Sequence, residues 1–410
     1  MKFRSALPCL IALALLTAAV HSQPLGTDIF TGHTSGRIVR TTPAGVSTTL
    51  GNFGYFINML TMDTDNKTIV ALDSLSGANP QKVIRIDPLT MTIVNTVFGG
   101  PPFTTVQSWL EVDQDGDYIV ADKTMLFKVF RNGSGLNTLY NDPNGYFFSF
   151  TEDKTTGDWL IGDYSARHIA RLDRHTMTLK TVIPIGAPPT GMMPDPQQEE
   201  IIISGGSTTF LSYHPVTHVV ATIVTGAGSA NASTVDRAPD GTGALLYAGT
   251  TGGQIIKFDR KGTNLGVFGS TGAGSCLGVA FDRSRNLGPE LITAPNDRII
   301  RLSFPGDAGK SYVFALSLSG CKPGVTLLDG RVIALNPDNL TVATSQFPIP
   351  PLLSGNIGVL DPFDEAIVTL NLNSLGNVVK GLRLYGVAIV IDPNAAMGIS
   401  QISSPLLFVL

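Results

Sequence analysis

The chain has 410 residues, of which 43% are hydrophobic and 15% are charged, and its formal net charge is −4 at neutral pH. This slightly negative balance excludes the basic footprint of a nucleic-acid-binding protein. The length exceeds that of one ordinary small domain and supplies ample material for a core. With 44 glycines and 26 prolines, the composition favours a turn-rich all-β protein over a helical one.

The N-terminus has the pattern of a secretory signal peptide. Lys2 and Arg4 form a positive end, residues 7–20 form an apolar stretch too short to span a membrane, and a small-residue cleavage site ends at Ser22. No later apolar run is long enough for a membrane span. We therefore expect a mature chain beginning at Gln23 that is exported: secreted, periplasmic or held at the cell surface.

The chain then repeats itself up to about residue 306. Most copies contain a turn rich in Asp, Asn or Gly, an apolar strand ending in a small residue, a strand that carries a base, and a further strand. The first copy lacks a clear inner strand and the last lacks a clear outer one. Successive copies lie 41 to 45 residues apart, which is the size of one four-stranded propeller blade. Seven copies predict a seven-bladed β-propeller, with six blades as the alternative. The residues aligned at the basic position are Arg40, Arg85, Lys128, Arg171, Ser212, Lys257 and Arg301.

The third copy shows the motif most clearly, in residues 110–122, LEVDQDGDYIVAD. This segment resembles an NHL-type repeat. The array over about residues 26–306 resembles the broad superfamily that also holds streptogramin-lyase-like and gluconolactonase-like propellers. The resemblance implies the ring fold but not one activity, because such rings host hydrolases, lyases and pure binding modules.

The period stops after Pro305-Gly306. The remaining residues show short alternating apolar runs separated by Pro- and Gly-rich turns, which is typical of a β-sandwich. Segments 324–331, 358–361 and 402–405 resemble a C-terminal module of secreted bacterial proteins. We therefore expect three parts: a signal peptide at 1–22, a β-propeller at 23–306 and a small β-sandwich domain at 307–410.

Acids and aromatic residues are concentrated in three consecutive copies. In a propeller, the loop after each second strand and the linker before each first strand open on one face. Carboxylates beside aromatic platforms on that face suit a polar ligand with apolar faces, or a divalent cation, Ca²⁺ or Mg²⁺, held by oxygen ligands. The competing interpretation is that each acid caps its own loop and each aromatic residue fills space between blades. The candidate binding residues are Asp73, Asp122, Asp163, Tyr55, Trp109 and Tyr146.

Two further patterns have structural interpretations. Export permits a disulfide between Cys276 and Cys321, with two unpaired thiols as the alternative. The base that recurs once per copy follows the repeat, so we expect it to be a solvent-facing strand position.

The favoured function is non-catalytic binding of a carbohydrate, a small polar molecule or a protein at the propeller face, without nucleic acid and without a firmly implied cofactor. The alternative, suggested by the resemblance, is a metal-dependent lyase or lactonase-type hydrolase. The sequence contains no Gly-x-Ser-x-Gly elbow and no Cys/His zinc spacing to support catalysis. A third possibility is a structural surface protein that attaches through residues 307–410.

Overall fold

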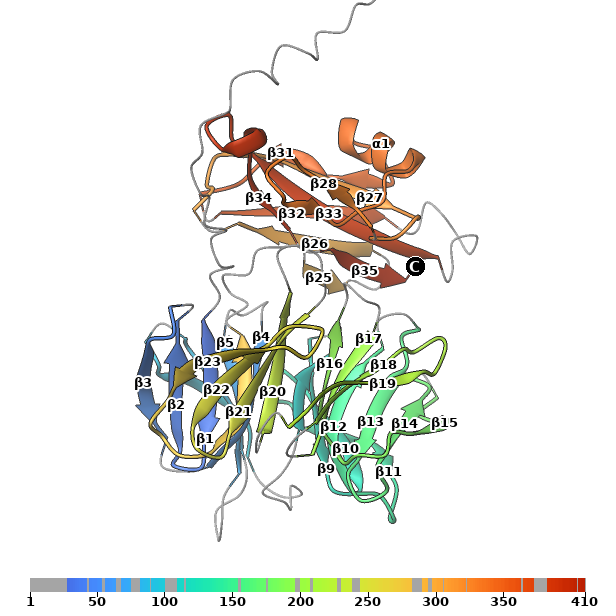
Figure 1. Ribbon diagram of the computed structural model, residues 1–410. Coiled ribbons are helices and arrows are strands. Elements are labelled where there is room, and N and C mark those ends of the chain that lie inside the picture. The colour runs from blue at the N-terminus through green and yellow to red at the C-terminus, as the bar shows by residue number, and fades with distance from the viewer. Residues whose placement is uncertain are drawn as a thin grey trace, which may run out of the picture.

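The computed structural model describes residues 28–409 except 43, 54–55, 64–67, 75–81, 89, 100–108, 114–115, 154–155, 175, 196–199, 207–208, 227–229, 238–243, 282–289, 294–296, 305, 322, 363, 372–381 and 404. The protein is all-β, as its composition predicts. Figure 1 shows a ring of sheets with a separate C-terminal group of strands lying over one side. None of the helices among the described residues has the length and apolar character needed to cross a bilayer.

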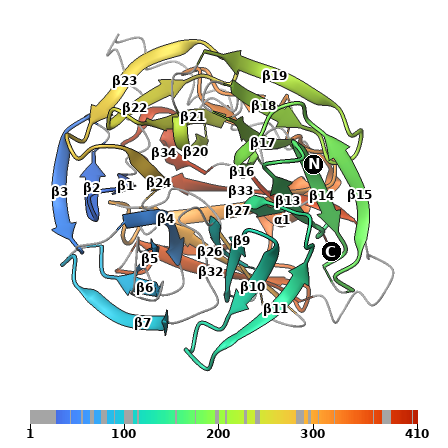
Figure 2. The same cartoon turned by 90° about the horizontal axis from the view of Figure 1, so that it is seen from below.

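The repeat region forms six four-stranded antiparallel sheets in the described part of residues 28–281, and Figure 2 shows them arranged around a common centre. We number these sheets 1 to 6 around the ring. Sheet 1 has the order β24-β1-β2-β3 and therefore combines both ends of the repeat region. Its strands are β1 (Ile29–His33), β2 (Arg37–Thr41), β3 (Ser47–Asn52) and β24 (Cys276–Phe281).

The other five sheets each take four strands that follow one another along the chain. Their strands are β4 (Phe56–Asp63), β5 (Thr68–Ser74), β6 (Lys82–Ile86) and β7 (Ile93–Gly99) in sheet 2; β8 (Trp109–Val112), β9 (Tyr118–Asp122), β10 (Met125–Val129) and β11 (Leu136–Asn141) in sheet 3; β12 (Phe147–Glu152), β13 (Trp159–Asp163), β14 (His168–Leu172) and β15 (Leu179–Pro184) in sheet 4; β16 (Pro189–Asp195), β17 (Glu200–Gly205), β18 (Thr209–Tyr213) and β19 (Val220–Thr225) in sheet 5; and β20 (Ala230–Arg237), β21 (Ala244–Thr250), β22 (Gln254–Phe258) and β23 (Asn264–Ser270) in sheet 6.

The innermost strands of neighbouring sheets lie against one another around the whole ring. β24 contacts both β20 and β4, so the order of contacts returns to its start. Two glycines allow the close approach at this junction. A Cβ added at Gly32 would lie 2.5 Å from Ile57 Cγ2, and one added at Gly278 would lie 2.8 Å from the Leu60 nitrogen. β24, the innermost strand of sheet 1, therefore packs between β20 of sheet 6 and β4 of sheet 2, and the glycines at the junction with β4 admit no side chain.

His33 reinforces this junction. It is fully buried, and its Nδ1–H donates to the carbonyl oxygen of Gly274 at 3.2 Å. Because a carbonyl only accepts, Nε2 is the unprotonated nitrogen and accepts from the Thr31 hydroxyl at 2.8 Å. A single neutral imidazole thus links β1 to the linker that precedes β24.

The seventh repeat copy does not form a seventh sheet of the ring. Its basic strand lies in β26 (Asp297–Ser303), which pairs with β25 (Glu290–Thr293) on one side and with β32 (Glu365–Asn371) on the other. β30 (Leu353–Ser354) completes this sheet. The sheet pairing therefore places residues 290–303 with the C-terminal strands, whereas the sequence analysis placed them in the propeller. The reason is the pairing of β26 with β32, whose residues 365–371 lie far along the chain, and a local repeat pattern does not reveal such a partner.

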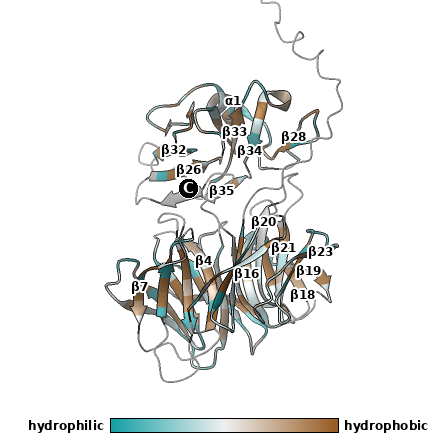
Figure 3. Ribbon diagram, turned by 90° about the vertical axis from the view of Figure 1, so that its left-hand side faces the viewer, coloured by the Kyte–Doolittle hydropathy of each residue, from teal (hydrophilic) through white to brown (hydrophobic). Residues whose placement is uncertain are grey.

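The C-terminal region is a pair of sheets around a shared core. The second sheet has the order β31-β27-β33-β34, and β35 also pairs with β33. Ile300, Leu302 and Val368 from the first sheet pack with Phe314 and Val390 from the second. Figure 3 shows apolar residues on the strands of both the ring and this region. The remaining elements are β27 (Ser311–Ser317), β28 (Val325–Thr326), β29 (Val332–Ile333), α1 (Asn339–Gln346), β31 (Ile357–Val359), β33 (Arg383–Ile391), η5 (Ala396–Gly398), β34 (Ile399–Ile402) and β35 (Leu406–Val409).

Of the two alternatives for Cys276 and Cys321, the structure shows two buried thiols and no disulfide. Cys276 lies in β24, where burial raises the pKa of its thiol to about 12. Cys321 belongs to a core of the C-terminal region that also contains Leu335 and Tyr385. The two thiols lie in different parts of the structure, the ring and the C-terminal region.

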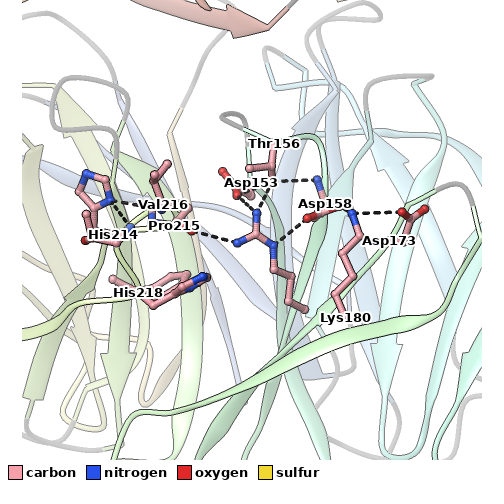
Figure 4. Close-up of polar contacts among 12 residues, drawn as sticks. Asp153, Thr156, Asp158, Asp173, Lys180, His214, Pro215, Val216 and His218 are labelled. Carbon is pink, nitrogen blue, oxygen red and sulfur yellow. Dashed lines mark hydrogen bonds and ion pairs between the residues drawn. The ribbon is translucent and has the colours of Figure 1, made fainter. Parts of the chain in front are cut away.

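Arg171 in β14 shows why the repeat carries a base on its third strand. Its Nε donates to Asp158 at 2.7 Å, its Nη2 donates to Asp153 at 3.0 Å, and its Nη1 donates to the Pro215 carbonyl of sheet 5 at 2.9 Å (Figure 4). The residue is only 7% exposed. The expectation of a solvent-facing base is therefore wrong for Arg171, which ties the turn between β12 and β13 to the next sheet.

Other copies repeat this link with their own residues. In sheet 3, Lys128 lies 3.0 Å from Asp113 and 3.1 Å from Asp117, the acids that begin and end the preceding turn. In sheet 1, Arg40 pairs with Asp28. In sheets 1, 3 and 4, the base of the third strand and an acid next to the preceding turn therefore form an ion pair.

Sheet 5 lacks this base, because Ser212 stands at the aligned position. Its acids Asp195 and Glu200 are bound instead by Arg260, which comes from the turn after β22 in sheet 6. A neighbouring sheet thus supplies the missing positive charge, and the substitution keeps both acids paired.

We expect Arg171→Met to lower the free energy of unfolding by about 3–5 kcal/mol, because two buried carboxylates lose their shared counter-charge. Lys180→Met is the matched control, since Lys180 binds the same Asp158 at 2.6 Å but its side chain is 44% exposed. This control should cost no more than about 1 kcal/mol. Urea unfolding of both variants makes the comparison, and equal losses would contradict the buried-network interpretation.

The stability of the ring should also fall in mild acid through His33. Burial, with a smaller contribution from nearby Arg37, lowers the pKa of His33 below its usual 6.5. The unfolded chain therefore binds this proton more readily, and stability is lost as pH falls below about 6.5. Urea midpoints measured from about pH 7.5 to about pH 5 should decline less in His33→Gln than in the wild type. Arg37→Gln, which leaves the burial intact, should retain most of the decline; a wild-type slope unchanged by His33→Gln would refute this assignment.

Candidate interaction face

The C-terminal region covers the face of the ring at which the innermost strands end (Figure 1). Glu152 ends β12 and binds Arg174 at 2.9 Å. Arg298 of β26 lies close to both: burial lowers its pKa, Glu152 opposes this effect and Arg174 adds to it. The opposite face, which we call the distal face, is formed by turns such as 122–125 and 163–168 and by linkers such as 142–146.

The three candidate acids occupy equivalent places on this side of sheets 2, 3 and 4. Asp122 and Asp163 are the last residues of β9 and β13, and Asp73 is the last but one of β5. All three are buried, with 3–4% of their surface exposed. They lie beneath the distal face and do not project from it. This burial differs from the exposed carboxylates that the sequence predicted as ligand-binding groups.

Asp163 stabilises its own turn. One carboxylate oxygen accepts from the Ala166 amide at 2.9 Å, and the other accepts from the Tyr146 amide at 3.2 Å. This arrangement corresponds to the loop-capping interpretation of the acids. Through it, a single buried side chain fixes the turn after β13 and the linker before β12 relative to each other.

Asp73 differs, because its Oδ1 atom is buried without a hydrogen-bond partner in the described part of the chain. Burial raises the pKa of this carboxyl to about 6, and the nearby Lys82 only partly offsets the effect. Near neutral pH the site therefore holds a carboxylate that folding has deprived of solvent.

No group of three or more His, Cys, Asp or Glu side chains is close enough to hold a metal ion among the residues that the structure describes. Asp73, Asp122 and Asp163 do not converge on one point in this sense. The divalent cation therefore stays a prediction without a located site, and so does the metal-dependent lyase or lactonase that would use it.

Trp109 packs inside the ring. It is 5% exposed and belongs to the core formed by sheets 2, 3 and 4. A Cβ added at Gly191 of sheet 5 would lie 3.1 Å from Trp109 Cη2 and 3.2 Å from Ser233 Oγ of sheet 6. The indole thus reaches across the centre of the ring to small residues on the other side. It fills space there, and it does not provide an exposed platform.

Tyr146 does lie on the distal face, within a cluster of three aromatic rings. Its ring centroid is 6.0 Å from that of Tyr164 and 6.3 Å from that of Phe148, and the last two lie 5.1 Å apart. Tyr164 is 39% exposed, and the other two are half-buried. We call Tyr146, Phe148 and Tyr164 the aromatic cluster. Tyr55, the remaining aromatic candidate, lies outside the described residues.

Two of these three rings were noted in the sequence analysis, and the third, Tyr164, was missed. Tyr146 and Phe148 precede or begin a first strand, where the copies in sheets 2 to 4 are rich in aromatic residues. Tyr164 follows Asp163 directly, and its amide donates to the Tyr146 carbonyl at 2.8 Å. An aromatic residue in the turn immediately after a strand-ending acid was the signal that could have identified it.

Comparison with known proteins agrees with the ring. No protein-family model and no curated protein matches the sequence. A chain from the crystal structure of a nidogen/laminin complex aligns with a TM-score of 0.52 and 14% identity, over 63% of this chain and 99% of that one. A protein of unknown function from Bacteroides caccae aligns at 0.46 with 12% identity, over 62% and 98%. A functionally unknown protein from Desulfotomaculum acetoxidans aligns at 0.43 with 11% identity, over 62% and 85%.

Identities this low show the fold alone. Only the alignment with the chain from the nidogen/laminin complex, at a TM-score of 0.52, is used to assign the fold. Together with the six sheets, it shows an all-β fold of the β-propeller kind in the repeat region. The NHL-type assignment of the repeats and the resemblance of the C-terminal residues to a secreted module stay predictions.

Asp73→Asn should stabilise the protein at neutral pH, because it removes a buried charge whose folded-state pKa is about 6. The raised pKa of Asp73 costs stability only at pH values above the ordinary pKa of an aspartate. The stabilisation gained by Asp73→Asn should therefore shrink toward about pH 4. Asp163→Asn, at the equivalent place in sheet 4, should cost about 1–3 kcal/mol at neutral pH, because one amide loses its acceptor. Thermal melts at both pH values test the pair, and a destabilising Asp73→Asn at neutral pH would contradict this account of the site.

Proposed function

We propose that the protein is a non-catalytic interaction module: a six-bladed β-propeller that binds a partner protein on its distal face. The observation that carries this proposal is the aromatic cluster, in which three rings contact one another at a partly exposed surface. Protein interfaces are enriched in aromatic residues at their centres, where a few such side chains supply most of the binding energy.

The strand pairing supports six blades and not seven. β24 completes sheet 1 by pairing with β1, which is how the two ends of the repeat region meet. The seventh copy contributes β26 to the C-terminal pair of sheets, whose shared core supports a β-sandwich domain. This domain covers the other face of the ring and leaves the distal face for a partner.

Two further observations support an exported interaction module. The aligned solved structure with the highest TM-score of the three comes from a complex named for two proteins, nidogen and laminin. The signal-peptide pattern at residues 1–22 supports export to the periplasm, the cell surface or the medium. A partner would then be another exported or surface protein.

A panel of purified extracellular proteins and glycans, probed with the labelled mature chain, tests the proposal. Tyr164→Ala should weaken binding of a genuine partner about tenfold, as expected for a central aromatic residue. Leu265→Ala is the matched control, because Leu265 is 51% exposed on the outer strand of sheet 6, and it should leave binding unchanged. Partners that respond equally to both variants would contradict the distal face, and lactone hydrolysis abolished by Tyr164→Ala would overturn the non-catalytic assignment.

A further inference from the structure

The distal face also carries two exposed cations next to the aromatic cluster. Lys123 stands in the turn between β9 and β10, and Arg167 stands in the turn between β13 and β14. Neither side chain makes a salt bridge with a described residue. Both residues have left-handed backbone, with φ of 50° for Lys123 and 55° for Arg167.

Backbone contacts hold these two turns and the cluster together as one unit. The Lys123 carbonyl accepts from the Phe147 amide at 2.5 Å, and Phe147 lies between Tyr146 and Phe148 in the sequence. The turn that contains Arg167 begins with Tyr164, whose amide is bound to Tyr146. The cations of sheets 3 and 4 therefore flank the aromatic cluster from its two sides.

None of the described acids of this region forms an ion pair with either cation. Asp122 and Asp163 are 3% exposed, and Asp163 is occupied by two amides. Asp142, in the linker before the cluster, accepts from the Asn144 amide at 3.0 Å within its own turn. His168, the other titratable residue of these turns, is half-buried at the start of β14. Two exposed positive side chains thus lie beside the three rings, and neither is paired with a described acid.

The opposite end of the same strands behaves differently. There Lys128 and Arg171 are paired with the acids of their own turns, and Arg260 binds the acids of sheet 5. Because exposed cations that lack a partner inside the molecule can form ion pairs at lower desolvation cost, they are suited to an external anion. The contrast lies between two ends of one repeat, so the repeat itself does not explain the two unpaired cations.

This inference rests on the proposed function and names the chemistry of the partner. We propose that the distal face binds an acidic segment of a partner protein, with Lys123 and Arg167 receiving carboxylates on either side of an apolar side chain that packs on the aromatic cluster. The arrangement combines a central apolar anchor with charges around it, which is the usual organisation of a protein-binding hot spot. The charges then set the association rate and the choice of partner.

Synthetic peptides in which glutamates flank a central phenylalanine are the probe, and the same peptides with glutamine in place of glutamate are the control. Calorimetry or fluorescence anisotropy with the full mature chain should show at least tenfold weaker binding of the glutamine peptides. Lys123→Gln and Arg167→Gln should each weaken binding of the acidic peptides about two- to fivefold, as expected for exposed ion pairs. Arg167→Lys should retain most of the affinity, and Lys261→Gln, at an exposed turn of the other face, should change nothing.

The outcomes separate this inference from the proposed function. Equal binding of acidic and glutamine peptides, still lost in Tyr164→Ala, would overturn the acidic segment and leave the interaction face standing. Binding of dextran sulfate through Lys123 and Arg167, with no binding of the peptides, would show that the site takes an anionic saccharide instead. Peptide binding that none of these variants affects, while each variant melts like the wild type, would overturn both proposals.

Discussion

Sheets 1, 3 and 4 depend on a link between a base on the third strand and the acids next to the turn before it. Arg171 is the fullest case, because its guanidinium contacts Asp153, Asp158 and a carbonyl of the next sheet while almost fully buried. A buried charge of this kind is costly unless its partners are in place. A sheet that contains this link must therefore preserve its turn, its third strand and the spacing to the next sheet together.

The two faces of the ring differ in how their charged side chains are paired. The linked acids and bases lie where the innermost strands end, on the side that the C-terminal region covers, and Arg298 of β26 adds to the charges there. At the distal end of sheets 3 and 4, Lys123 and Arg167 form no ion pair with a described residue. Asp163 is buried there, and its carboxylate accepts hydrogen bonds from two amides. The aromatic cluster and the two unpaired cations lie at the surface above it. The binding proposal follows from this asymmetry.

Period, strand type and the positions of the candidate residues were predictable from the sequence, because strand alternation and turn chemistry are local signals. Burial was not, since it depends on which sheet lies opposite. Trp109 was predicted as a surface platform, but the small residues Gly191 and Ser233 on the far side of the ring leave room for it at the centre. The strand at 297–303 repeats the local pattern of a blade, yet a partner at 365–371 takes it into another sheet. The sequence showed the acidic turn and the recurring base as two separate patterns. Only the hairpin geometry shows that these side chains form ion pairs with each other.

Closure of the ring by β24 is the claim on which the blade count and both faces depend. Engineered cysteines test it directly, because Thr31 of β1 stands opposite Val279 of β24, and direct cross-strand partners lie within reach of a disulfide. Thr31→Cys with Val279→Cys should form a bond under mild oxidation, detected by mass spectrometry of the folded protein. Failure of this bond to form in the folded protein would contradict the six-sheet ring.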